Sequence, residues 1–126
     1  LLIVENDAKI RNSLQDVLLD DGWDVEAVSS AESAFSQIGH RPPSLIVLNM
    51  MMPTMNGFEF LGQLRHDPRW QNIPVIVVSD TELSPGEKER IRLQHADVVN
   101  KAEFEHGELV SKIQSMIEQT LSVSTD

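Results

Sequence analysis

Short apolar runs alternate with segments of helical periodicity along this chain, and the alternation limits the fold more than any other feature. The apolar runs predict strands at residues 1–4, 23–28, 45–48, 74–78 and 98–99. Runs of this length, bounded by turn residues, are too short for helices and are typical of buried strands. A strand–helix unit repeated five times predicts an α/β protein with a mostly parallel sheet.

The intervening segments carry helix start and stop signals. Ser30 and Asn56 precede apolar residues at helical spacing and suit N-cap positions. Residues 84–87 (Ser-Pro-Gly-Glu) have the cap, proline and glutamate of a helix start. Residues 20–22 (Asp-Asp-Gly) and Pro68 mark helix ends. Because parallel crossovers are right-handed, we expect a doubly wound (βα)5 sandwich of flavodoxin-like type, with strand order 2-1-3-4-5.

Length, charge and cysteine content exclude several classes of protein. The 126 residues suffice for one domain, which we expect at residues 1–121, with a frayed tail or linker at 122–126. A net charge of −10 disfavours binding to nucleic acid or to an anionic membrane. Without cysteine there is no disulfide and no thiolate chemistry. No apolar run approaches the ~20 residues of a membrane span, and the run at residues 1–4 lacks the charged segment of a signal peptide, so we expect no signal peptide and a cytoplasmic protein.

Polar residues follow four of the five predicted strands. They are Glu5, Asn6 and Asp7 after the first strand, Asn49 after the third, Ser79 after the fourth and Lys101 after the fifth. The carboxyl ends of parallel strands share one edge of the sheet, where ligands of such folds bind. Oxygen ligands suit Mg²⁺, and lysine and serine suit phosphoryl oxygens. We therefore predict the functional site at this edge.

The segment after the third strand resembles a known family. Residues 52–59, reading MPTMNGFE, follow the run at 44–49 and resemble the phosphoacceptor segment of two-component response-regulator receiver domains. The resemblance extends over nearly the whole chain. It implies a non-enzymatic signalling module that works with a histidine kinase or phosphotransfer protein, or with an attached kinase or output domain. In that family the face made by the fourth helix, fifth strand and fifth helix contacts partners and is where a dimer would form.

The resemblance also implies a role for each polar residue at the sheet edge. It assigns Asn49 to the phosphoacceptor position and Ser79 and Lys101 to the phosphoryl pocket. It assigns the metal ligands to Glu5, Asn6 and the backbone carbonyl of Met51, with Mg²⁺ as the implied cofactor.

The chain departs from the family pattern at three positions. Asn49 stands where the family has aspartate, Asn6 stands where it has a metal-binding acid, and Ala102 replaces the proline that usually follows the lysine in a cis bond. A carboxamide is a poor nucleophile, so an aspartyl-phosphate cannot form at Asn49. With Glu5 as the remaining acid, we expect Mg²⁺ binding to be weak or absent, and Asn49→Asp alone to restore little of it. For Asp7 we favour a role at the start of a helix, where a negative charge is favourable, over a role as a rescuing ligand or acceptor.

Three functional hypotheses follow. Because three departures occur together, we favour a naturally degenerate receiver domain that acts as a protein-interaction or regulatory module. The alternative is an ordinary phosphorylatable receiver carrying an engineered Asp-to-Asn change. A flavodoxin-like cofactor-binding enzyme is a remote third, because residues 5–9 (ENDAK) do not form a Ser/Thr/Gly-rich phosphate loop and there is no P-loop or nucleophile-elbow motif.

Overall fold

The computed structural model describes residues 1–52 and 54–122, and its strands and helices alternate throughout. The strands are β1 (Leu2–Val4), β2 (Glu26–Val28), β3 (Ile46–Asn49), β4 (Val75–Ser79) and β5 (Ala96–Asn100). The helices are α1 (Ala8–Asp20), α2 (Ala31–His40), α3 (Gly57–His66), α4 (Pro85–Leu93) and α5 (His106–Ser122), with a 3₁₀ turn η1 (Lys101–Glu103). The predicted proline turn at Pro53 and residues 123–126 of the predicted tail lie outside the described residues.

The five strands form one parallel sheet in the order β2-β1-β3-β4-β5, which confirms the predicted order. The register places Asn49 of β3 opposite Val78 and Ser79 of β4 opposite Asn100. All strands therefore end at the same edge, and the polar residues that follow them lie along it.

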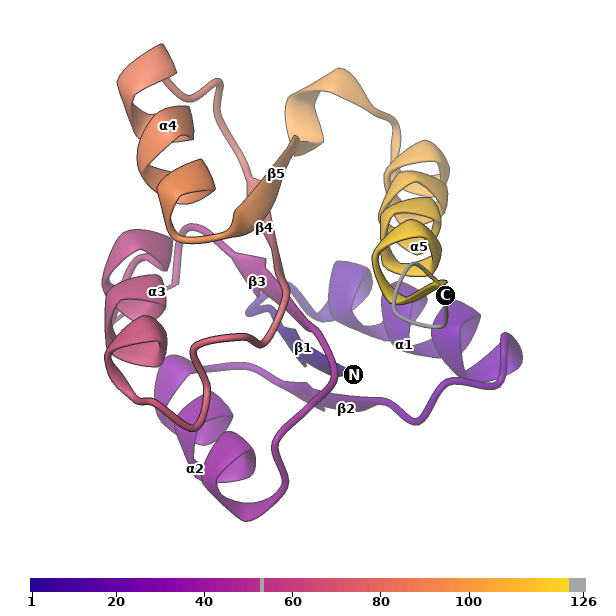
Figure 1. Cartoon of the computed structure of the whole chain (residues 1–126). Coiled ribbons are helices and arrows are strands. Elements are labelled where there is room, and N and C mark those ends of the chain that lie inside the picture. The colour runs from indigo at the N-terminus through magenta and orange to yellow at the C-terminus, as the bar shows by residue number, and fades with distance from the viewer. Residues whose placement is uncertain (53, 123–126) are drawn as a thin grey trace.

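Helices cover both faces of this sheet (Figure 1). Helices α1 and α5 pack on one face, and α2, α3 and α4 pack on the other. Successive side chains of a strand point to opposite faces of the sheet. Ile3 and Val47 therefore pack on the face covered by α1 and α5, whereas Leu2 and Ile46 pack on the face covered by α2, α3 and α4. Burial on both faces explains why the strands read as near-continuous apolar runs.

The predicted helix caps are present. Ser30 Oγ accepts from Ser33 N at 3.1 Å, and Asn56 Oδ1 accepts from Glu59 N at 3.0 Å. At α4 both halves of a capping box form, because Ser84 Oγ accepts from the Glu87 backbone and Glu87 Oε1 accepts from the Ser84 backbone. These bonds satisfy backbone groups that a helix start leaves without partners.

Two predicted strands, β2 and β5, differ from the structure by more than one residue at an end or in length. Strand β2 begins at Glu26 rather than at Trp23, because β1 has only three residues and pairs only with Glu26–Val28. The Trp23 N–H instead donates to the Leu18 carbonyl of α1 at 3.1 Å. Strand β5 runs over Ala96–Asn100 rather than over 98–99 alone, because β4 pairs with it along five residues. The turn η1 was not predicted.

Gly57 begins α3 against the Met50 side chain. A Cβ at Gly57 would lie 2.7 Å from Met50 Sδ and 3.3 Å from Met50 Cα, and Met50 is buried. We expect Gly57→Ala to lower the free energy of unfolding by about 1–3 kcal/mol, measured by urea denaturation. Gly62→Ala is the matched control in the same helix, because a Cβ there meets nothing within 4 Å and alanine has the better helix propensity. Equal stability of the two variants would contradict this prediction.

Candidate functional site

Asn49, the last residue of β3, is buried against the loop that follows β1. Its Nδ2 donates to Glu5 Oε2 at 2.7 Å and to Asn6 Oδ1 at 2.6 Å. The same nitrogen lies 3.5 Å from the Met51 carbonyl oxygen, and Asn49 Oδ1 accepts from Met51 N at 3.3 Å. Glu5 and Asn49 are 3% and 4% exposed, so the bond between them is shielded from water, whereas Asn6 and Met51 lie at the surface. The structure thus brings together four residues that the sequence predicted at this edge.

The partners of Asn49 fix the orientation of its amide. An ionised Glu5 carboxylate can only accept hydrogen bonds, and the Met51 N–H can only donate. With the amide reversed, Asn49 Oδ1 would face the Glu5 carboxylate and Nδ2 would face the Met51 N–H. Both contacts would be repulsive, so Nδ2 points to Glu5 and Oδ1 to Met51.

Lys101 supplies the positive charge of the site. Its Nζ lies 3.3 Å from Glu5 Oε1 and 2.9 Å from Asp80 Oδ1, and its side chain is 15% exposed. Burial acts to lower the pKa of Lys101, but the hydrogen bond to Asp80 and the charges of Glu5 and Asp80 outweigh it, so the pKa lies above its ordinary value. The Lys101 ammonium therefore pairs with two acids, Glu5 and Asp80. The sequence did contain a signal for this pairing, because Asp80 is an acid directly after Ser79 at the same edge of the sheet.

Ser79 and Asp7 engage their own loops. The buried Ser79 hydroxyl donates to the Thr81 carbonyl at 2.6 Å and accepts from Thr81 N at 3.3 Å. Asp7 is the N-cap of α1, where its Oδ1 accepts from Lys9 N at 2.9 Å and from Ile10 N at 3.4 Å. The helix-start role of Asp7 is confirmed. Its role as a rescuing ligand stays a prediction, as does the phosphoryl-pocket role of Ser79.

The side chains at this edge fit a divalent cation poorly. Glu5 Oε2 already accepts from Asn49 Nδ2 and from Asp7 N at 3.1 Å, and Glu5 Oε1 faces the Lys101 ammonium. The amide of Asn49 presents N–H groups, not oxygen, to the space between Glu5 and Asn6. Over residues 1–52 and 54–122, no cluster of three or more histidine or acidic side chains is arranged to hold a metal. Mg²⁺ is usually held by one or two carboxylates together with waters and phosphate, and the single buried acid here is already engaged.

The response regulator receiver domain family matches residues 1–114. The chain belongs to this family. The receiver domain is similar to the phosphate regulon regulatory protein PhoB of Escherichia coli, with 30% identity over 121 residues that cover 93% of this chain and 51% of PhoB. It is also similar to response regulator Rre1 of Synechocystis, with 35% identity over 80 residues that cover 63% of this chain and 35% of Rre1. The receiver domain spans between 35% and 60% of the length of its first four curated relatives.

Solved structures agree with this assignment. The chemotaxis response regulator CheY4 of Vibrio cholerae has a TM-score of 0.76 and 25% identity, covering 90% of this chain and 94% of CheY4. The Mn²⁺-bound form of response regulator Rcp1 has a TM-score of 0.77 and 20% identity, covering 93% of this chain and 90% of Rcp1, and bears on the fold alone. The flavodoxin-like fold of receiver domains is therefore the fold of this chain.

Membership gives the receiver domain a general role. Receiver domains are signalling modules, generally without enzymatic activity, that interact with histidine kinases and output domains, and they bind Mg²⁺. Within the part of the chain that the structure describes, no helix is long and apolar enough to cross a membrane.

Proposed function

We propose that this receiver domain is a degenerate member of a two-component phosphorelay that cannot be phosphorylated at Asn49 and acts as a protein-interaction or regulatory module. The observation that carries the proposal is the buried amide of Asn49, at the end of β3, hydrogen-bonded to Glu5 and Asn6. In this proposal Asn49 occupies the phosphoacceptor position, and Ser79 and Lys101 lie in what would be the phosphoryl pocket.

The chemistry of an amide in this position opposes phosphoryl transfer. Attack on phosphorus needs an anionic or activated nucleophile. Asn49 Oδ1 is uncharged and accepts from Met51 N, while the lone pair of Nδ2 is delocalised and its N–H groups donate to Glu5 and Asn6. Neither atom of the amide is free to attack, and no carboxylate occupies that place.

The state of a receiver without a covalent switch would be set by partner binding or by a fixed conformation. In the loop between β4 and α4, Glu82 accepts from Lys88 Nζ and from Asn100 Nδ2, both at 2.8 Å, so this loop contacts both α4 and β5. We propose that a histidine kinase, a phosphotransfer protein or an attached kinase or output domain contacts this domain in the cytoplasm. The face made by α4, β5 and α5 is the proposed dimer surface, and neither nucleic acid nor membrane is a proposed partner.

Intact-mass measurement tests the proposal. The protein is incubated with Mg²⁺ and acetyl phosphate beside the Asn49→Asp and Asn6→Asp/Asn49→Asp variants. We expect no phosphoryl gain on the unmodified chain, little on the single variant and a clear gain on the double variant, which regains both acids.

Two outcomes would redirect the assignment. A gain on the unmodified chain would contradict the proposal, and Asp7→Asn would then show whether Asp7 is the acceptor. A complete gain on Asn49→Asp alone would favour the alternative, an ordinary phosphorylatable receiver carrying an Asp-to-Asn change.

A further inference from the structure

We propose that the Asn49 carboxamide replaces a divalent cation structurally, by tying the loop after β1 to the loop after β3, so that the folded domain is independent of divalent metal. The inference rests on the proposed function in one respect, since both assign Asn49 to the same pocket. It goes further in naming what holds the pocket together.

The geometry around Asn49 Nδ2 carries the inference. A carboxylate oxygen of Glu5, the amide oxygen of Asn6 and the backbone oxygen of Met51 lie 2.7, 2.6 and 3.5 Å from this single nitrogen. Carboxylate, amide and backbone oxygens are the kinds of ligand that hard cations bind. The NH₂ group has two hydrogens, so the two short bonds use its donors fully and the Met51 carbonyl makes a longer contact. The partial positive charge of the NH₂ group is thus directed at oxygens that would otherwise repel one another.

The same contacts oppose entry of a cation. A metal ion could reach these oxygens only after Nδ2 moved away, which would break the bonds to Glu5 and Asn6. Reversing the amide would also break the bond from Met51 N to Asn49 Oδ1. The Lys101 ammonium on the other Glu5 oxygen further lowers the attraction of the pocket for a second cation.

Thermal unfolding with millimolar MgCl₂ or with EDTA tests the inference. We expect the unmodified domain to have the same Tm in both. The Asn49→Ala variant leaves the buried Glu5 carboxylate and the exposed Asn6 amide oxygen without this donor, and we expect its Tm to fall by roughly 5–10 °C. Asn12→Ala is the matched control, because Asn12 is exposed on α1 and this substitution should leave the Tm almost unchanged.

A gain-of-metal variant completes the test. In Asn6→Asp/Asn49→Asp, acids replace two amides beside Glu5, so we expect a lower Tm in EDTA and a clear rise with MgCl₂. A rise in the Tm of the unmodified domain with MgCl₂ would overturn the inference. An Asn49→Ala variant with the same Tm as the Asn12→Ala control would also overturn it. The comparison of the unmodified domain with and without MgCl₂ needs no variant, so failure of a variant to fold does not remove the test.

The outcomes also separate this inference from the proposed function. A Tm that responds to MgCl₂, together with no phosphoryl gain by mass, would overturn the inference and leave the degenerate receiver intact. A phosphoryl gain on the unmodified chain, together with a Tm that does not respond to MgCl₂, would overturn the proposed function and leave this inference intact.

Discussion

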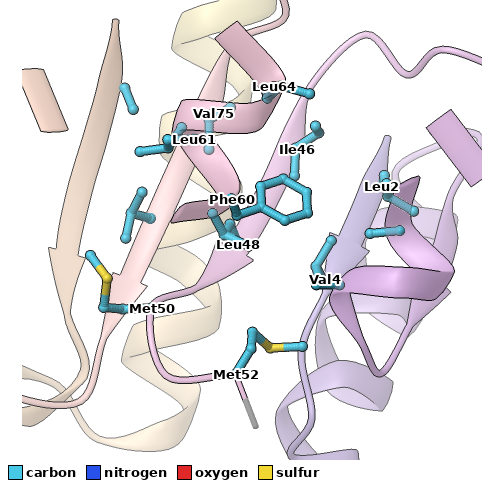
Figure 2. Close-up of a cluster of buried hydrophobic side chains, with 14 of the residues drawn as sticks. Leu2, Val4, Ile46, Leu48, Met50, Met52, Phe60, Leu61, Leu64 and Val75 are labelled. Carbon is cyan, nitrogen blue, oxygen red and sulfur yellow. The ribbon is translucent and has the colours of Figure 1, made fainter. Parts of the chain in front are cut away.

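Replacing Phe60 with alanine should lower the free energy of unfolding by about 4 kcal/mol, the largest loss that we expect from one substitution in this domain. Phe60 is 1% exposed, and its ring stacks on Phe35 of α2 with centroids 4.6 Å apart and an interplanar angle of 24°. Figure 2 shows the ring directed from α3 over β3, beside Ile46 and Leu48. Truncation would remove the contact between two helices and the sheet and leave a cavity that rigid strands cannot close.

Urea unfolding followed by circular dichroism measures this loss, and Phe58→Ala is its control. Phe58 belongs to the same helix but is only partly buried, with the Arg90 guanidinium 4.0 Å from its ring centroid. We expect Phe58→Ala to cost about 1–2 kcal/mol, because less apolar area returns to water and an exposed cation–π contact is weak. Equal losses for the two variants would contradict the central position that the structure gives Phe60.

The fold was predictable because burial on both faces of the sheet leaves a plain signal in the sequence. Strands β3 and β4 are buried along their full length, and their apolar runs give their positions to within one residue. The boundary of β2 was not predictable in this way. Trp23 and Val25 are apolar because they pack in the core cluster on the α1 and α5 side of the sheet, whereas strand pairing depends on the length of β1, which those residues do not encode.

The candidate site was predictable as a location but not as a set of contacts. Parallel strands end at one edge, so the approach of Asn49 to Glu5 and Asn6 follows from the strand order. Contacts made by loop side chains depend on rotamers that no periodicity encodes. The pairing of Lys101 with Asp80 and the turn of the Ser79 hydroxyl towards Thr81 are of this kind. The metal and phosphoryl roles of these residues stay predictions.

The second large effect concerns the charge balance at the same edge. Lys101→Met should lower the free energy of unfolding by about 3 kcal/mol, because it leaves the buried Glu5 carboxylate without a cation. Methionine keeps most of the side-chain volume, so the loss reports charge rather than a cavity. Adding Glu5→Gln to Lys101→Met should recover part of the stability, since the second change removes the uncompensated charge. A double variant less stable than Lys101→Met would contradict this account.

The pH dependence of the Lys101 contribution has a definite sign. Because the pKa of Lys101 in the folded domain lies above its ordinary value, the ion pairs stabilise the fold throughout the range below ~10.4, and their contribution is lost as pH rises through the folded pKa. The stability difference between the unmodified domain and Lys101→Met should therefore stay constant from about pH 6 to pH 9 and shrink only in stronger alkali. Urea denaturation at several pH values measures it. A difference that already shrinks between neutral pH and about pH 9 would mean that burial, which lowers the pKa of this ammonium, outweighs its partners Glu5 and Asp80.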